Sequence, residues 1–358
     1  MIYSVITGTG SFIPEKSIKN EDFLTTDFYE TYGRKLERPN REVIDKFLEI
    51  TTIEERRYAD DNLVTSDLAF FAARQALENA GVDKEELDYI IVAHNFGDVR
   101  SDNRRTDIVP ALASRVKHML GIINPEAVAY DLPFGCPGWL QALIQADYFI
   151  RSGDAKKILV IGADVLSRIA DPHDRDSMLY ADGAGAVVVE GVESEFPVGV
   201  VAHKTRSDTH AYLNMLNMGL SFKQDEVTGD NLYLKMNGRR LYQYALETVP
   251  IAIKAAIDKS GLHISDISKV LIHQANGKMD DAILKRLYAL YGIADAPSGV
   301  MPMSISWLGN SSVATLPTLL DLIMRGDLPA HSINPGDKIV FASVGAGMNI
   351  NALVYLVG

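Results

Sequence analysis

The strongest constraint on the fold of this 358-residue chain is a pattern of helix, turn and strand that occurs twice. Residues 67–95 predict a helix, a glycine turn, a short polar segment and a strand that ends at His94. Residues 245–276 repeat this order, and their strand ends at His273. Self-similarity of this kind indicates a duplicated structural unit.

The two copies also match further along the chain. Arg151 follows Cys136 by 15 residues, Arg325 follows Asn310 by 15 residues, and a glycine and a predicted strand come after each arginine. Chance similarity is the alternative, and the matched offsets favour duplication. Helices that alternate with strands predict an α/β protein with parallel strands beneath helices. We expect the two halves to cover residues 1–190 and 191–358.

Two segments break the repeated pattern. Residues 15–60 are polar, include a predicted helix over 41–57, and are expected to form an insertion or cap on the first half. Residues 203–235 are irregular. Within them, 211–220 either pack as a loop on the body or form a flexible wall, rich in Met and Leu, for an apolar substrate.

Composition narrows the class of protein. Apolar residues make up 47% of the chain, which is enough for a large core, and the net charge of −12 argues against general nucleic-acid binding. No run approaches the roughly 18 apolar residues of a membrane helix, and no signal peptide is evident. A single cysteine excludes an intrachain disulfide and a Cys-rich zinc site. We therefore expect a cytoplasmic protein that binds neither membranes nor nucleic acid.

The only cysteine, Cys136, lies in the segment DLPFGCPGWLQAL. Most lone cysteines are buried and behave as small hydrophobic residues. Here, however, a predicted buried strand over 127–132 turns directly into a predicted helix that ends near Gly153. The positive end of a helix dipole lowers the pKa of a thiol from its usual value of about 8.5. The sequence therefore predicts that Cys136 is a nucleophile with a lowered pKa.

His273 and Asn310 are the candidate partners of Cys136. Alone, a histidine at a strand end is usually a core residue, and an asparagine before a helix is usually a cap. In the duplicated frame, however, Asn310 is equivalent to Cys136, and packing of the halves about a pseudo-twofold axis would bring all three together. The glycine turn that contains Gly347 could add a backbone N–H. The shorter patterns GTGSF and DGAGA do not complete a nucleotide-binding loop, and we expect both to be tight turns.

Six segments together resemble the β-ketoacyl-acyl-carrier-protein synthase III family of the thiolase-like superfamily. They are GTGSFIP near the N-terminus, DLPFGCPGW around Cys136, DGAGAVV from Asp182, YLKMNGR ending at Arg239, LIHQAN around His273 and WLGNSSVATLP around Asn310. The resemblance runs from residue 2 nearly to the end. It implies a five-layered αβαβα fold of two duplicated halves, and a homodimer.

The resemblance also implies roles for individual residues. Cys136 would accept an acyl group from a thioester of CoA or a carrier protein. His273 and Asn310 would then stabilise the enolate formed as malonyl carrier protein loses carbon dioxide, and the backbone N–H groups of Cys136 and Gly347 would form the oxyanion hole. No metal or organic cofactor would be required. The residues expected to bind the acyl carrier protein are Arg239, Arg240, Asn276 and Lys278.

Other functions remain open from the sequence. The same fold and cysteine serve hydroxymethylglutaryl-CoA synthase, head-to-head acyl condensation, and initiation or cyclisation in secondary metabolism. A Cys-His thioester hydrolase, with water as the acceptor, is the alternative from another class of enzyme. The presence of Cys136, His273 and Asn310 argues against a subunit that has lost activity.

One segment departs from the family. Members primed by acetyl-CoA commonly carry a Trp and an Arg that stack on the CoA adenine, and here Lys46 and Ile50 occupy these positions. Phe47 could replace the missing Trp. The segment 95–112 also differs. We therefore expect acetyl-CoA to be a poor donor and a longer or functionalised acyl chain, carried by a protein, to be preferred.

Overall fold

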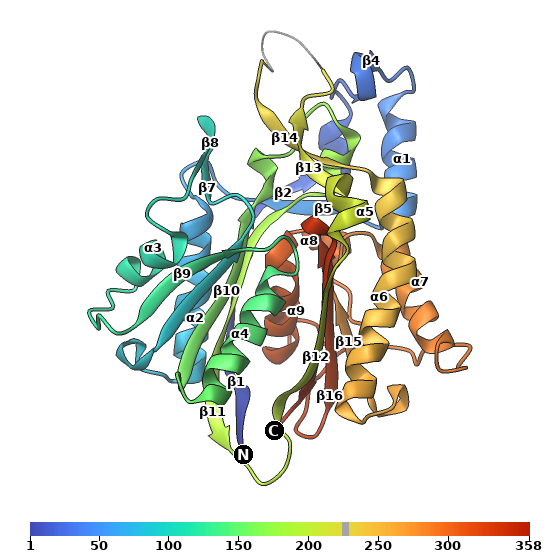
Figure 1. Cartoon of the computed structure of the whole chain (residues 1–358). Coiled ribbons are helices and arrows are strands. Elements are labelled where there is room, and N and C mark those ends of the chain that lie inside the picture. Colours follow the sequence, from blue (N-terminus) through green and yellow to red (C-terminus); the bar gives the residue numbers. More distant parts are fainter. Residues whose placement is uncertain (224–228) are drawn as a thin grey trace.

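The computed structural model describes residues 1–223 and 229–358 and contains two main β-sheets (Figure 1). The strands of the first, in spatial order, are β1 (Ile2–Phe12), β11 (Asp182–Glu193), β10 (Lys157–Val165), β6 (Tyr89–His94) and β9 (Val128–Pro133). The strands of the second are β12 (Gly199–Ser207), β17 (Asn349–Leu356), β16 (Lys338–Gly345) and β15 (Lys269–Ile272). In both sheets two antiparallel pairings come first, followed by two parallel pairings in the first sheet and one in the second. The predicted duplication is therefore confirmed.

Helices form three layers around these sheets. The helices between the sheets are α4 (Gly138–Ser152) and α9 (Thr315–Met324), whose apolar side chains share one core with both sheets (Figure 1). The outer helices of the first sheet are α2 (Thr65–Ala80) and α3 (Leu112–Met119), and those of the second are α6 (Gly238–Ser260) and α7 (Gly277–Ala289). The expected αβαβα arrangement is confirmed. Within the described residues, no helix is both long and apolar enough to cross a membrane.

Glycines explain how the repeated units begin and end. The equivalent helices α2 and α6 both stop at a glycine in the left-handed conformation, Gly81 (φ 64°) and Gly261 (φ 76°), as the predicted turns require. The expectation of tight turns at GTGSF and DGAGA is wrong, because both segments lie in strands, β1 and β11. Their glycines allow a helix to approach: a Cβ at Gly8 would lie 2.4 Å from the carbonyl oxygen of Ala76 on α2.

The polar insertion caps both halves, not only the first. Its helix α1 (Asn40–Thr51) is shorter than the predicted 41–57, because Thr52 takes a left-handed conformation (φ 63°) and β5 (Glu55–Tyr58) follows. Helix α1 packs on α7 of the second half so closely that a Cβ at Gly277 would lie 2.2 Å from Thr52 Oγ1. In Figure 1, α1 lies at the end of the molecule opposite the two termini.

The irregular segment of the second half contains a hairpin. After β12 and the short helix α5 (Thr209–Tyr212), strands β13 (Leu216–Leu220) and β14 (Leu232–Met236) pair antiparallel. Part of the predicted 203–235 region, residues 224–228, lies outside the described residues. The hairpin projects at the same end of the molecule as α1 (Figure 1).

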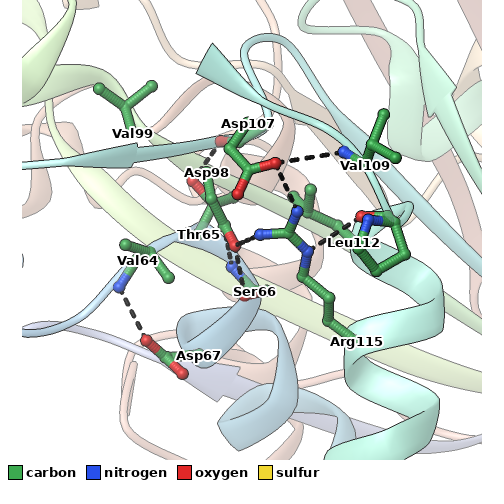
Figure 2. A network of polar contacts seen from close by, with 12 residues as sticks. Val64, Thr65, Ser66, Asp67, Asp98, Val99, Asp107, Val109, Leu112 and Arg115 are labelled. Carbon is green, nitrogen blue, oxygen red and sulfur yellow. Dashed lines mark hydrogen bonds and ion pairs between the residues drawn. The ribbon is translucent and has the colours of Figure 1, made fainter. Parts of the chain in front are cut away.

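The segment 95–112, which also differs from the family pattern, is held by an ionic network (Figure 2). Its strands β7 (Asp98–Arg100) and β8 (Asn103–Asp107) form a small hairpin. Arg115 on α3 donates to Asp98 at 2.7 Å and to Asp107 at 2.8 Å. Asp98 also accepts from the backbone N–H and hydroxyl of Ser66 on α2. These contacts attach the hairpin to both outer helices of the first half.

Candidate active site

A cavity of about 900 Å³ collects the predicted reactive residues of both halves. Cys136 comes from the first half, and His273 and Asn310 come from the second. Side chains of α1 and of the β13–β14 hairpin form other parts of the lining: Lys46, Phe47, Ile50, Leu216, Met218, Leu234 and Met236. The segment 211–220 packs Met215 into the core of the second half and supplies Leu216 and Met218 to this lining, so each of its two interpretations describes part of it. An apolar substrate at this wall stays a prediction.

Cys136 lies in the sharp connection between β9 and α4. Gly135 before it has φ 69°, and a Cβ there would lie 2.9 Å from the backbone nitrogen of Ala346. A Cβ at Gly345 would lie 2.6 Å from the nitrogen of Cys136. Two glycines therefore let the backbones of the two halves meet beside the thiol. Strand β9, predicted to be buried, is a half-exposed edge strand.

The prediction of a lowered thiol pKa is wrong. Burial raises the pKa of Cys136 to about 11, a hydrogen bond from Ser312 lowers it, and the negative charge of Asp164 raises it. Desolvation disfavours the charged thiolate and outweighs the favourable position at the start of α4. The thiol is therefore protonated near neutral pH.

His273 follows strand β15, and its backbone N–H donates to the carbonyl oxygen of Ala342 at 2.8 Å. The side chain is 4% exposed, and its Nδ1 has no hydrogen-bond partner among the described residues. Burial lowers the pKa of His273 to about 4. The imidazole is therefore neutral at pH 7, with one N–H donor and one nitrogen that can accept a hydrogen bond.

Asn310 is fixed by hydrogen bonds on its backbone and its side chain. Its N–H donates to the carbonyl of Leu179 at 2.9 Å, and its own carbonyl accepts from the N–H of Ala181 at 2.9 Å. The side-chain Oδ1 accepts from the backbone N–H of Ser312 at 2.9 Å. With Oδ1 occupied, the NH₂ group is the part of the carboxamide available to a bound molecule.

The other predicted residues are distributed along and around the cavity. Arg239 and Asn276 line it, and Asn276 also caps α7 by accepting from the N–H of Met279 at 3.1 Å. Arg240 and Lys278 are exposed on the outer surface of α6 and α7. Gly347 (φ 77°) lies in the turn after β16, where its neighbour Ala346 lines the cavity.

Sequence reasoning missed several polar residues of this cavity. Asn95, Ser312, Asp176 and Tyr180 all line it. The hydroxyl of Tyr180 is buried and has no hydrogen-bond partner in the described part of the chain. Burial, followed by the charge of Asp174, raises the pKa of Asp176 to about 7. Ser312 lies in the GNSS motif and Asn95 follows a strand end, so the sequence could have indicated both as site residues. No sequence pattern indicates Asp176 or Tyr180.

Two family models match the chain. The model described as 3-oxoacyl-[acyl-carrier-protein (ACP)] synthase III matches residues 130–208, and the model of its C-terminal part matches residues 257–357. The β-ketoacyl-[acyl-carrier-protein] synthase III of Hyphomonas neptunium is 32% identical over 356 residues, which cover 98% of each chain. The sequence similarity therefore includes both halves.

Solved structures give the same result. The β-ketoacyl-[acyl-carrier-protein] synthase III of Thermus thermophilus superposes with a TM-score of 0.79 at 31% identity, over 99% of each chain. The priming β-ketosynthase of the R1128 polyketide biosynthetic pathway superposes with a TM-score of 0.80 at 27% identity, over 99% of this chain and 96% of the other. The architecture is shared across the whole chain.

Proposed function

Because this chain belongs to the β-ketoacyl-[acyl-carrier-protein] synthase III family of condensing acyltransferases, we propose that Cys136, His273 and Asn310 carry out its decarboxylative Claisen condensation. One observation carries the assignment: a thiol from one half and an imidazole and a carboxamide from the other line a single cavity. The family acts in fatty-acid biosynthesis or in related condensing pathways.

The first step transfers an acyl group to Cys136. The thiol loses its proton and its sulfur attacks the carbonyl carbon of the acyl thioester, while the thiol of CoA or of the carrier leaves and takes up a proton. Because the pKa of Cys136 is about 11, the proton must be removed as the attack occurs.

The second step forms the carbon nucleophile. An N–H of His273 and the NH₂ group of Asn310 donate to the thioester carbonyl oxygen of malonyl carrier protein. Carbon dioxide leaves and its bonding electrons form the enolate, whose negative oxygen these two donors stabilise. Both donors are uncharged, so they provide this stabilisation without protonating the enolate carbon.

The third step makes the carbon–carbon bond. The enolate carbon attacks the acyl carbonyl on Cys136, and the resulting oxyanion accepts hydrogen bonds from the N–H groups of Cys136 and Gly347. Each donor of this kind typically lowers the barrier by roughly 3 to 4 kcal/mol. The tetrahedral species then expels the Cys136 thiolate, which recovers a proton, and releases the β-ketoacyl carrier protein. No metal or organic cofactor takes part.

Three single-residue variants test these roles. Cys136→Ala should take up no acyl group from acyl-CoA or acyl carrier protein in intact-protein mass spectrometry, while unfolding at the wild-type temperature. His273→Ala and Asn310→Ala should still be acylated but should release carbon dioxide from malonyl carrier protein at least 100-fold more slowly, on the order expected for the loss of one such donor. Normal decarboxylation in either variant would show that its role is assigned wrongly.

A second candidate function is chain initiation for a secondary metabolite. It is favoured by the similarity to the R1128 priming enzyme and by the apolar wall that the β13–β14 hairpin adds to the cavity. The test is to load Cys136 from a panel of acyl thioesters, add malonyl carrier protein and identify the product by mass. A β-ketoacyl product with a long or branched chain would support initiation. A free acid would instead identify a thioester hydrolase.

We also infer a homodimer and a cytoplasmic location. Strand β9 ends the order of the first sheet, and Val128 on it is 47% exposed. An edge strand of this kind is a template for pairing with a second chain. Light scattering should give twice the chain mass for the wild type and a lower mass for Ala129→Pro, and a monomeric wild type would reject the dimer. The single cysteine agrees with a reducing compartment, which cell fractionation would test.

A further inference from the structure

The thiol of Cys136 ends a partly buried series of hydrogen bonds that the proposed mechanism does not use. The hydroxyl of Ser312 donates to Cys136 Sγ at 3.3 Å. The oxygen of that hydroxyl accepts from Asn95 Nδ2 at 2.8 Å. Asn95 is held in turn by Asp164 on β10, which accepts from both its backbone N–H and its Nδ2.

The direction of each hydrogen bond in this series follows from the groups involved. A carboxylate can only accept, so both anchoring bonds run from Asn95 to Asp164. The second N–H of the Asn95 side chain then occupies a lone pair of the Ser312 oxygen. The hydroxyl proton cannot point back at a donor, and it is therefore directed at the sulfur of Cys136.

Ser312 makes a second contact, with Asn310, which is assigned to the malonyl thioester. Its backbone N–H donates to Asn310 Oδ1 at 2.9 Å. This bond orients the carboxamide so that its NH₂ group is free for the malonyl thioester. One residue thus contacts the groups that serve both substrates.

Ser312 makes these contacts from an unusual backbone conformation. It has φ 56°, a left-handed conformation that is uncommon for residues other than glycine, and its side chain is only 3% exposed. Such a conformation costs on the order of 1 kcal/mol or more and persists only where the surroundings impose it. The strained residue is therefore one that contacts both Cys136 and Asn310.

We propose that Ser312 is a positioning residue. It holds the thiol of Cys136 and the carboxamide of Asn310 in the orientations that the two half-reactions need. Asn95 and Asp164 fix the direction of its hydroxyl. The proposal rests on the assigned roles of Cys136 and Asn310. The negative Asp164 raises the pKa of Cys136, so this carboxylate does not serve to ionise the thiol. Its contribution is to fix the direction of a hydrogen bond that favours the thiolate.

The test separates the two contacts of Ser312 by their chemistry. Ser312→Ala and Ser312→Gly both remove the hydroxyl and keep the backbone N–H, and glycine also accepts the left-handed conformation without strain. Alkylation of Cys136 by iodoacetamide at pH 8, without substrate, should slow about tenfold in both, since a hydrogen bond to a charged group has roughly that effect. Carbon dioxide release from malonyl carrier protein should stay within about threefold of wild type, because the N–H to Asn310 remains.

Ser311→Ala is the matched control. Its buried hydroxyl contacts Thr315 Oγ1 at 3.4 Å, so its loss should leave the alkylation of Cys136 unchanged. Asn95→Ala should slow alkylation less than Ser312→Ala. The double variant Asn95→Ala with Ser312→Ala should be no slower than Ser312→Ala alone, because Asn95 acts through the hydroxyl.

Several outcomes would overturn the proposal. These are wild-type alkylation in Ser312→Ala, an equal loss in Ser311→Ala, additive effects of Asn95 and Ser312, or parallel loss of alkylation and decarboxylation. Melting temperatures identify any variant that fails to fold, and Ser312→Gly, which relieves the strained backbone, is expected to melt no lower than wild type. Alkylation needs no condensation, so failure of the proposed function would leave this readout interpretable.

Discussion

Burial determines the protonation of the two ionisable residues that react in this cavity. The pKa of Cys136 is about 11 and that of His273 is about 4, so both are uncharged near neutral pH. Below its pKa, the thiolate fraction of a cysteine rises tenfold for each pH unit. We therefore predict that alkylation of Cys136 by iodoacetamide, without substrate, accelerates about tenfold per pH unit from pH 7 to pH 10. The rate is measured by intact-protein mass spectrometry. A plateau below pH 8 would contradict the raised pKa, and His273 should add no inflection above pH 5.

The same residues show how far sequence reasoning reaches. The nucleophile could be predicted because the turn from strand to helix is a local feature of the residues around Cys136. Its pKa could not, because residues that lie beside the thiol, such as Gly345 and Ser312, are distant in sequence and belong to the other half. Asn310 could be predicted from its equivalence to Cys136. The orientation of its side chain depends on a left-handed serine that no propensity indicates.

At the scale of elements, helix α1 contributes Lys46, Phe47 and Ile50 to the lining of the cavity. Lys46 forms an ion pair with Glu49 at 2.9 Å, and Ile50 is 38% exposed. The ring of Phe47 lies 5.9 Å from the guanidinium carbon of Arg56 and packs on an apolar cluster, so it is already engaged within the protein. Neither Lys46 nor Ile50 offers a planar group on which the adenine of CoA could stack.

We therefore predict that acetyl-CoA acylates Cys136 more slowly than a medium-chain acyl or β-ketoacyl carrier protein does. The double variant Lys46→Trp with Ile50→Arg should speed loading from acetyl-CoA several-fold, because stacking typically contributes about 1 kcal/mol or more. Loading from the acyl carrier protein, which has no adenine, is the control and should not increase. Faster loading of the wild type from acetyl-CoA would assign the chain to ordinary fatty-acid initiation.

The predicted elements agree best with the structure where a hydrophobic period and a capping glycine occur together, as in α2 and α4. They were least accurate where packing between distant elements decides the structure. The glycines of β1 and β11 look like turn residues in sequence, yet they serve the close approach of α2 and α9. Helix α1 ends early because Thr52 takes a left-handed conformation, and Thr52 packs against Gly277 of the second half.

At the scale of the whole molecule, the net charge bears on how a carrier protein could reach the cavity. The chain has a net charge of −12, which repels a negatively charged carrier protein. Arg239 lines the cavity, and Arg240 and Lys278 are exposed on the neighbouring surface of α6 and α7. Lys278 is partly compensated by Glu49, whose Oε1 lies 3.5 Å from its Nζ. Arg240 is therefore the better test of a local positive landing site.

We predict that Arg240→Glu raises the KM for malonyl carrier protein several-fold at low salt, with little change in kcat, because an exposed charge mainly changes the rate of encounter. The effect should shrink as ionic strength rises and screens the interaction, to a Debye length of about 8 Å near 0.15 M. Arg74→Glu on the outer helix α2 changes the net charge of the protein by the same amount at an exposed site outside the cavity lining. A response to Arg240→Glu that Arg74→Glu does not share would locate carrier docking at the start of α6. Equal responses in the two variants would mean that total charge alone governs the encounter, and an unchanged KM in Arg240→Glu would place docking elsewhere.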